Sequence, residues 1–272
     1  MNLTLDALTK TTSVIVRRMV TASPIDSALD HALVQRWRRR WDDVMANYLP
    51  GLSALENVIG TVAETTCAGP PEAVLDLGGG PGVLAERLSA RWPEADVRLL
   101  DLDPVLLALA RAAAPAGVTV HHADLSHSGW PARAVPDRRV DLVTVIMTMH
   151  YLPEDRVRAL YHDIRAVLRP GGLLVVADCM HDGDLPAVMN PLHPVADEAV
   201  AGVAWSQWWD EVGAEASLRA AMAERDELFT GRPPAEFTPD EQWHRAAARA
   251  AGYAEAGIIW RQGAHAALCA VA

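Results

Sequence analysis

Short apolar runs alternate with longer stretches of helical character through the middle of the chain. Each run is typical of a strand, and the runs lie at residues 74–77, 97–100, 118–125, 140–147 and 173–177. Strands that alternate with helices are typical of a parallel sheet covered by helices on both faces. The pattern therefore predicts an α/β fold with a doubly wound, mostly parallel sheet.

Two further apolar runs near the end of the chain complete the predicted sheet. They lie at residues 256–261 and 265–271 and are joined by the short turn Gln262-Gly263-Ala264. Strands joined in this way form an antiparallel hairpin. With this carboxyl-terminal hairpin the expected sheet has seven strands.

The amino-terminal region is expected to be helical. A first helix is predicted at residues 27–48 and a second at residues 55–65. The first places apolar side chains at intervals of four, four and three, which is helical spacing. These side chains are Leu33, Trp37, Trp41 and Val44. We expect residues 1–69 to form a helical cap and residues 70–272 to form the main domain.

A helical insertion, about residues 181–237, separates the fifth strand from the final hairpin. Its predicted helix, residues 200–228, ends before a pair of prolines. Thr238 as N-cap and Pro239 at the first helical position predict the start of another helix, which would end at Gly252. We expect the insertion to act as a lid.

The first strand leads into a glycine-rich turn that is typical of a nucleotide-cofactor loop. Residues 74–82 are Val-Leu-Asp-Leu-Gly-Gly-Gly-Pro-Gly, and a helical stretch follows at residues 83–91. Glycines let the backbone approach a ligand closely, and the start of a helix offers unpaired N–H groups. The spacing is G-x-G-x-G, whereas the dinucleotide pattern G-x-G-x-x-G would need its third glycine at Val83.

Acidic residues at the strand ends indicate the charge of the ligand. Asp76 lies beside the glycine turn, where it would repel a pyrophosphate and attract a cation. Asp101 ends the second strand and is expected to bind ribose hydroxyls. Asp124 ends the third strand, where it can accept a hydrogen bond from an adenine amino group. This pattern favours a nucleoside with ammonium and sulfonium groups over NAD.

Composition limits the class of partner. The chain has 24 Lys and Arg against 35 Asp and Glu, a formal net charge of −11, which argues against nucleic-acid binding. The cysteines Cys67, Cys179 and Cys269 lack paired spacing, so neither a disulfide framework nor a metal site is expected. No apolar run approaches a membrane span and no leader pattern is found, so we expect a cytoplasmic protein without a membrane partner. The high content of Ala and Arg with very little Lys is typical of a high-GC bacterial sequence.

Five motifs in order resemble those of class I S-adenosylmethionine-dependent methyltransferases. They cover about residues 70–180 and are LDLGGGPG, LLDLDP, HADL, VDLVTVIMTMHYLP and LRPGGLLVVAD. One glycine loop alone would be weak support, whereas five ordered motifs are specific. The resemblance implies that the cofactor is S-adenosyl-L-methionine.

The resemblance also implies which residues hold the methionine part of the cofactor. Asp76 and the backbone of Gly78 and Gly80 would face it, and main chain near Met147 would hold its amino group. The stretch YLPGLSALENVIGTVAE is similar to the cofactor-capping helices of methyltransferase-like enzymes of wobble-uridine biosynthesis. Tyr48 in this stretch would contact the cofactor's carboxylate, or alternatively pack at the end of its helix.

For the adenosine part, the resemblance assigns residues after the second and third strands. Asp101 would bind the ribose and Leu102 would pack on the adenine. Asp124 would accept from the adenine amino group, and the N–H of Leu125 would donate to a ring nitrogen. Each carboxylate has an alternative role at a strand end or helix cap. Capping is the better explanation for Asp103, which precedes a proline.

Methyl transfer to a hydroxyl or an amine requires removal of a proton, so a base is expected beyond the strand ends. His150 follows the fourth strand and is the leading candidate, since the ordinary pKa of histidine lies near neutrality. A structural role for His150 is the alternative. Asp178 and His181, after the fifth strand, are the next candidates, and Tyr151 is expected to contact the acceptor.

Trp205, Trp208 and Trp209 lie on the predicted lid, as either a core stripe or a platform for an apolar or aromatic acceptor. We therefore expect methyl transfer to a small molecule of specialised metabolism, with oxygen ahead of nitrogen or carbon as acceptor atom. The alternatives are modification of tRNA or of the cofactor itself, and a cofactor-binding protein without catalysis. The protein is expected to act as a monomer or a homodimer.

Overall fold

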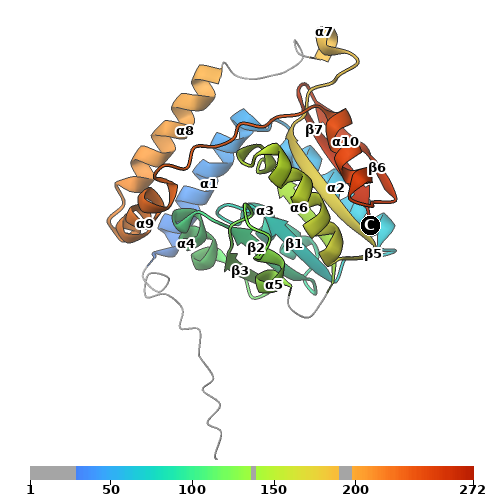
Figure 1. Cartoon of the computed structure of the whole chain (residues 1–272). Coiled ribbons are helices and arrows are strands. Elements are labelled where there is room, and N and C mark those ends of the chain that lie inside the picture. Colours follow the sequence, from blue (N-terminus) through green and yellow to red (C-terminus); the bar gives the residue numbers. More distant parts are fainter. Residues whose placement is uncertain (1–28, 136–138, 190–197) are drawn as a thin grey trace, which may run out of the picture.

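The computed structural model describes residues 29–135, 139–189 and 198–272. Residues 1–28 of the predicted cap and residues 190–197 of the predicted insertion lie outside the described residues. One sheet of seven strands crosses the molecule (Figure 1). Its strands are β1 Ala73–Leu77, β2 Asp96–Asp101, β3 Val118–His122, β4 Val140–Ile146, β5 Leu168–Cys179, β6 Glu255–Gln262 and β7 His265–Val271.

The strand order confirms the predicted topology. The strands run in the order β3-β2-β1-β4-β5-β7-β6. β1 to β5 pair in parallel, and β7 is antiparallel to both β5 and β6. The doubly wound sheet with an antiparallel hairpin at its end is therefore confirmed. The strand order reverses between β1 and β4, and sheets of this type bind ligands outside the carboxyl ends of the strands at such a point.

Helices cover both faces of this sheet (Figure 1). Side chains alternate along a strand, so each strand contributes to two apolar clusters. Leu75 belongs to the cluster on one face and Val74 to the cluster on the other. The helices of the first face are α5 Trp130–Ala134, α6 Glu154–Val167 and α10 Glu241–Ala250. Those of the second face are α2 Leu52–Thr66, α3 Val83–Arg91 and α4 Pro104–Ala113.

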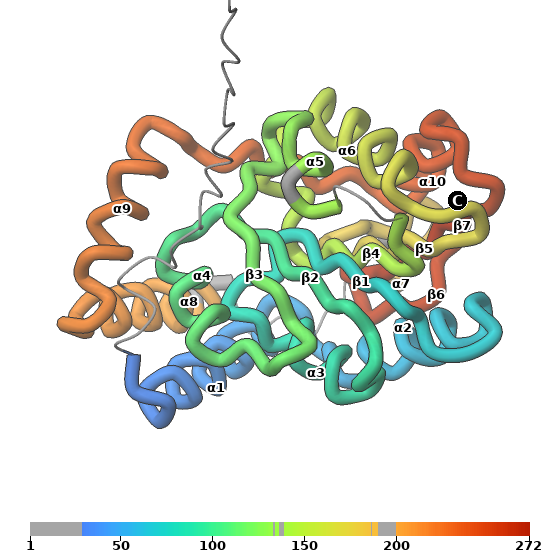
Figure 2. The backbone as a smooth tube through the Cα atoms, turned by 90° about the horizontal axis from the view of Figure 1, so that it is seen from below, coloured from blue at the N-terminus to red at the C-terminus, as the bar shows by residue number. Residues whose placement is uncertain are grey.

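A third group of helices forms a separate layer beside α4. It consists of α1 His31–Tyr48, α8 Glu198–Gly213 and α9 Arg219–Phe229. α1 and α8 lie side by side in both views (Figures 1 and 2), and Trp37 and Trp208 are buried between them. The amino-terminal helix and the insertion therefore pack on each other, although they lie far apart in the sequence.

The insertion is broken where the sequence predicts a continuous helix over residues 200–228. α8 ends at Gly213, and the N–H groups of Ala214 and Glu215 bond to carbonyls three residues earlier. Leu218, in the short 3-10 turn that follows, is fully buried in the layer formed by α1, α8 and α9. Burial of this leucine bends the chain between α8 and α9, and helical periodicity alone could not reveal it. The remaining short elements are α7 Pro186–Met189 and the 3-10 turns η1 Met149–Tyr151 and η3 Ala216–Leu218.

Helix caps show one confirmed and one wrong prediction. Asp103 caps α4 by accepting from the N–H groups of Val105 and Leu106, as its place before a proline predicts. For α10, however, the N-cap is Asp240, whose side chain accepts from the N–H of Trp243. Thr238 and Pro239 therefore precede the helix and do not start it.

β5 is longer than predicted. It begins at Leu168 instead of residue 173, so residues 169–172 belong to the strand, with Gly171 at φ 76°. The pairing with β4 shifts register between Val140 and Leu142, which is how a bulge accommodates this glycine. Pro170, Gly171 and Gly172 favour a turn, but pairing with the neighbouring strand β4 outweighs this local preference.

Candidate active site

The glycine loop between β1 and α3 needs its glycines for two reasons. Gly78, Gly80 and Gly82 all have positive φ, at 69°, 55° and 80°. In addition, a Cβ on Gly78 would lie 2.3 Å from the Oγ1 of Thr148, which no side chain could tolerate. The loop therefore brings bare backbone close to the carboxyl end of β4.

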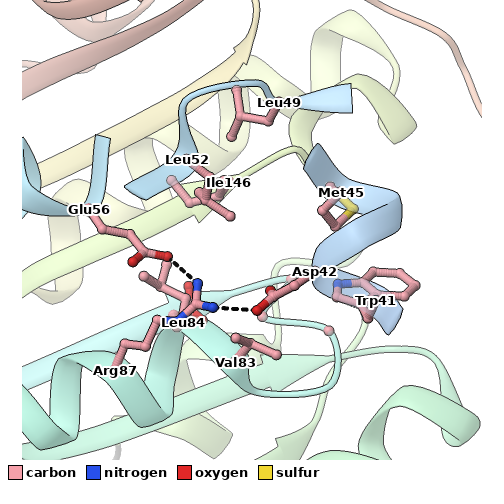
Figure 3. Close-up of a pocket in the computed structure, with 14 residues that line it drawn as sticks. Trp41, Asp42, Met45, Leu49, Leu52, Glu56, Val83, Leu84, Arg87 and Ile146 are labelled. Carbon is pink, nitrogen blue, oxygen red and sulfur yellow. Dashed lines mark hydrogen bonds and ion pairs between the residues drawn. The ribbon is translucent and has the colours of Figure 1, made fainter. Parts of the chain in front are cut away.

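A pocket opens between this loop and the helices α1, α2 and α3 (Figure 3). It encloses about 540 Å³, including the solvent at its mouth. Apolar side chains form most of its wall, together with three acids and one cation. The lining residues are Trp41, Asp42, Met45, Leu49, Leu52, Glu56, Asp76, Gly78, Gly79, Gly80, Val83, Leu84, Arg87 and Ile146. With three acids against one arginine, the pocket favours a cationic ligand.

Arg87 ties the two amino-terminal helices to the cofactor loop. It forms ion pairs with Asp42 of α1 and Glu56 of α2, the latter at 2.6 Å (Figure 3). Burial raises the pKa of Asp42, while the guanidinium of Arg87 opposes that rise. The wall of the pocket therefore depends on residues from both predicted parts of the chain.

Asp76 is the most unusual group in the pocket. Its side chain is buried, and its Oδ1 accepts from the hydroxyl of Thr144 at 2.7 Å. Among the described residues, its Oδ2 has no hydrogen-bond partner. Burial raises the pKa of Asp76 to about 7, and the charge of Asp101 adds to the shift. A buried carboxylate oxygen without a partner is costly, and a ligand with N–H donors or a positive charge would satisfy it.

Asp101, the predicted ribose ligand, is placed at the end of β2 beside the glycine loop. One of its oxygens accepts from the N–H of Gly80 and the other from the N–H of Asp103, each at 2.8 Å. Burial raises the pKa of Asp101 to about 6, although these N–H donors oppose the rise. The carboxylate is therefore oriented by backbone, next to the loop that would hold the ligand. Leu102 follows it and is half-buried.

Asp124 lies at the end of β3, on the same edge of the sheet. Its carboxylate accepts from the N–H of Ser126 and from the guanidinium of Arg232, a residue of the insertion. Leu125 is buried, and its carbonyl accepts from Arg156. The sequence offers no signal for the contact of Arg232 with Asp124, because 108 residues separate the two.

The structure brings together two of the three candidate catalytic residues. The Nδ1 of His150 lies 2.8 Å from the Oδ1 of Asp178, and the backbone N–H of His150 is 3.4 Å from the Oδ2. The N–H of Cys179 also donates to Asp178. Asp178 is nearly buried while the His150 side chain is 18% exposed, so part of the imidazole side chain is accessible. The third candidate, His181, lies instead with its Nε2 3.7 Å from the Sγ of Cys179.

Aromatic side chains lie near this pair, beginning with Tyr151. The ring of Tyr151 lies 4.1 Å from that of His150, and the ring of Tyr48 lies 5.9 Å from that of Trp205. Tyr151 is half exposed, and partial burial of its phenol raises its pKa to about 12. The charge of Asp178 and the phenol of Tyr48 also raise this pKa, so both groups lie near Tyr151.

The three tryptophans of the insertion have different surroundings. Trp208 is 1% exposed, packs edge-on against Trp37 and Trp41, and is a core residue, which corrects its prediction as an acceptor contact. Trp209 is covered by the guanidinium of Arg225, 3.7 Å from its ring centroid. Trp205 is half-buried and contacts Trp41 and Tyr48, so it is the one of the three that borders the candidate site.

Met147, predicted to lie beside the cofactor's amino group, follows β4 with φ at 48°. A positive φ is uncommon for a residue other than glycine, and strain of this kind is often found at functional sites. Its N–H donates to the carbonyl of Ala177. The turn after β4 is therefore held to β5, next to Asp178.

In the described ranges, no three His, Cys, Asp or Glu side chains are grouped so that they could hold a metal ion. No helix within the same ranges combines the length and the apolarity needed to cross a membrane.

Comparison with known proteins identifies a methyltransferase domain within the chain. Residues 74–172 match the family model described as "Methyltransferase domain". Trans-aconitate 2-methyltransferase of Escherichia coli (strain 55989 / EAEC) is 33% identical over 144 residues, which are 53% of this chain and 50% of that protein. Carboxy-S-adenosyl-L-methionine synthase of Chromohalobacter salexigens is 25% identical over 164 residues, or 60% of each protein. The chain thus spans about half the length of the first of these curated relatives.

A solved structure shares the fold. It is an O-methyltransferase family protein from Burkholderia thailandensis, with a TM-score of 0.52 and 17% sequence identity over 87% of this chain and 61% of that one. The domain match, the relatives and the shared topology agree with the five ordered motifs. Residues 74–172 therefore match a methyltransferase domain, and the motifs and topology of the chain resemble those of class I S-adenosylmethionine-dependent methyltransferases, whose cofactor is S-adenosyl-L-methionine.

Proposed function

We propose that this protein transfers a methyl group from S-adenosyl-L-methionine to a hydroxyl group of a small apolar or aromatic metabolite. The observation that carries the proposal is the pairing of His150 with the nearly buried Asp178 at the carboxyl end of β4 and β5. This pair is a ready general base next to the cofactor pocket. A hydroxyl acceptor needs such a base, whereas many other acceptors do not.

The charge of the pocket supports the cofactor assignment. The unpartnered Oδ2 of Asp76 suits the cationic methionine end, with the backbone of Gly78 and Gly80 alongside. Asp101, oriented by two backbone N–H groups, suits a pair of ribose hydroxyls. Bound in this way, S-adenosyl-L-methionine supplies an electrophilic methyl group on a sulfonium.

Further contacts complete this cofactor assignment. Asp124 and the N–H of Leu125 would bind the adenine, with Leu102 packed on its ring. Main chain at Met147 and the phenol of Tyr48 would lie at the methionine end. Within the predicted cap, residues 1–69, the described helices α1 and α2 would cover this end, consistent with their side chains that line the pocket.

The chemistry of the His150–Asp178 pair follows from its geometry. An imidazole that donates from Nδ1 to a carboxylate carries its lone pair on Nε2, which can take the proton of an acceptor hydroxyl. Asp178 then stabilises the imidazolium, because its carboxylate is nearly buried and lies 2.8 Å away. The rest of the acceleration comes from alignment of the acceptor and exclusion of water.

Aromatic side chains near the His150–Asp178 pair support an apolar or aromatic acceptor. Tyr151 of η1 contacts His150, and Tyr48 of α1 contacts Trp205 of α8. Rings of this kind bind flat apolar molecules and keep water away from the reacting atoms. Such acceptors are common among the products of specialised metabolism in bacteria.

A carboxylate is the second candidate acceptor. One relative, 33% identical over 144 residues, is named trans-aconitate 2-methyltransferase. A carboxylate is ionised at neutral pH and needs no base, so the paired His150 favours a hydroxyl. A third possibility, chemistry on the cofactor itself, follows from the relative named carboxy-S-adenosyl-L-methionine synthase.

The proposal is tested in two steps. Calorimetry with S-adenosyl-L-methionine first measures cofactor binding, and mass spectrometry identifies any copurified nucleoside. A panel of phenols, hydroxyindoles, amines and carboxylic acids is then incubated with methyl-labelled cofactor. We expect transfer to a hydroxyl compound. Tight cofactor binding without transfer to any member of the panel would instead favour a non-catalytic cofactor-binding protein.

A further inference from the structure

An extended segment, residues 232–240, crosses the candidate active site and is here called the strap. It runs from α9 to α10 past the carboxyl ends of the central strands, as the long connection between these helices in Figure 1 shows. Gly231, at φ 71°, turns the chain out of α9. Pro233 and Pro234 then keep it extended, since proline also restricts the residue before it.

The middle of the strap is held to the loop that carries the candidate base. The N–H of Phe237 donates to the carbonyl of His150 at 3.0 Å, and the N–H of Ala235 donates to the carbonyl of Tyr151 at 3.3 Å. The strap therefore supports the backbone on which His150 is placed.

The first residue of the strap is held to the adenine end of the site. The Nη2 of Arg232 lies 2.8 Å from the Oδ1 of Asp124, 2.7 Å from its Oδ2 and 2.8 Å from the Oγ of Ser126. The Ser126 N–H also donates to the Oδ1 at 2.8 Å. These contacts fix the plane of the carboxylate from two sides, one local and one from the insertion.

A second arginine of the insertion makes an ion pair of a different kind. The Nε of Arg225 lies 2.7 Å from the Oδ2 of Asp103. Asp103 is buried, and its other oxygen caps α4. Asp124, by contrast, caps no helix among the described elements and keeps 22% of its side chain exposed at the strand edge where a ligand would bind. The Arg225 pair is therefore structural, whereas the Arg232 pair lies at the edge of the sheet where a ligand would bind.

We propose that Arg232 is a positioning residue that orients the Asp124 carboxylate to read the exocyclic amino group of adenine. Selectivity for the adenine base is then set by the insertion as well as by the loop after β3. The inference rests on the proposed function, because it takes the ligand to be an adenosyl cofactor. A carboxylate has about four lone-pair sites. The exposed His127, whose Nδ1 lies 3.2 Å from the Oδ2, is the partner of Asp124 that would give way to the adenine.

The test compares two ligands that differ at one group. One is S-adenosylhomocysteine, and the other is its hypoxanthine analogue, in which a carbonyl oxygen replaces the amino group. A carbonyl cannot donate to Asp124, so the native protein should prefer the adenine ligand by about 10- to 100-fold in Kd. Calorimetry measures both affinities for the native protein and for Arg232→Ala, Arg232→Lys and Arg225→Ala.

Arg232→Ala is expected to reduce the preference for adenine to about threefold or less, and Arg232→Lys to restore part of it. Arg225→Ala, the matched control, should lower thermal stability and leave the preference unchanged. The ratio of two affinities does not depend on the fraction of protein that is folded. Full preference retained in Arg232→Ala, or tighter adenine binding in that variant, would overturn the inference. If the native protein bound neither ligand, the proposed function would fail, and the inference with it.

Discussion

The two halves of the candidate site are built in different ways. In the cofactor half, backbone N–H groups close in sequence hold Asp101, and the hydroxyl of Thr144 on the neighbouring strand holds Asp76. The acceptor half joins α1, η1, the end of β5 and α8, through His150, Asp178 and Trp205. The acids of the cofactor half lie at the carboxyl ends of β1 and β2, whereas the acceptor half is assembled from segments far apart in the chain.

The electrostatic state of the two halves also differs. In the cofactor half, burial raises the pKa of Asp76 to about 7 and leaves one of its oxygens without a partner among the described residues. In the acceptor half, the carboxylate of Asp178 is already satisfied by His150 and by backbone N–H groups. The cofactor half is therefore incomplete until a cation binds, whereas the acceptor half is already organised. Each prediction below tests one side of this difference.

Removal of the base should produce the largest effect. We expect His150→Ala to lower turnover of a hydroxyl acceptor by about 10²- to 10⁴-fold, the usual contribution of a general base. Cofactor affinity should not change, because His150 belongs to the other half. His181→Ala is the control and should keep native turnover, since His181 lies beside Cys179. Steady-state kinetics and calorimetry on the same preparations separate the two quantities. Native turnover in His150→Ala would remove the base assignment and favour a carboxylate acceptor.

Loss of Asp101 should produce the next largest effect, on binding. Asp101→Ala is expected to weaken cofactor affinity by about 100-fold, through lost charged hydrogen bonds to the ribose and a less ordered glycine loop. Asp103→Ala, two residues away, should instead cost about 1 kcal/mol of stability as a lost helix cap. Calorimetry and thermal unfolding distinguish these outcomes, and an unchanged affinity in Asp101→Ala would end the ribose assignment.

The pH dependence of cofactor affinity should be smaller, about tenfold. Since burial raises the pKa of Asp76 to about 7, a fall from pH 8 to pH 6 protonates it and removes its attraction for the cationic ligand. Asp76→Asn should flatten this dependence of affinity on pH.

In the absence of ligand, the pH dependence of protein stability has the opposite sign. The folded state binds a proton that the unfolded chain has released, so the contribution of Asp76 to the free energy of unfolding falls as pH rises from about 4 to about 7. Thermal unfolding at several pH values, with and without cofactor, measures both trends.

The smallest effect is expected at the wall of the acceptor cleft. Trp205→Ala should raise the KM for an aromatic acceptor by about fivefold, the loss of one ring contact, and leave cofactor affinity unchanged. Trp209→Ala is the matched control on the same helix, because Arg225 covers that ring. Equal effects of the two substitutions on KM would show that the insertion acts on the acceptor only through its overall stability.

Local sequence was sufficient for the sheet and for the acids at its edge. The glycine loop follows β1, Asp101 is the last residue of β2, and Asp124 comes soon after β3, so strand prediction alone places them at one edge. Adjacent strands also bring His150 and Asp178 together, because β4 and β5 are neighbours. Their actual pairing depends on side-chain rotamers, which a linear pattern does not describe.

The amino-acid sequence by itself determined the α/β topology, the cofactor loop and the acidic edge, because these depend on periodicity and on neighbouring residues. Tertiary structure alone decided that Trp208 is core and Trp205 borders the site, that α8 and α9 are separate helices, and that Arg232 reaches Asp124. Each of these features depends on how segments far apart in the chain pack together. Burial of one face against a distant partner leaves no signature in the spacing of the residues themselves.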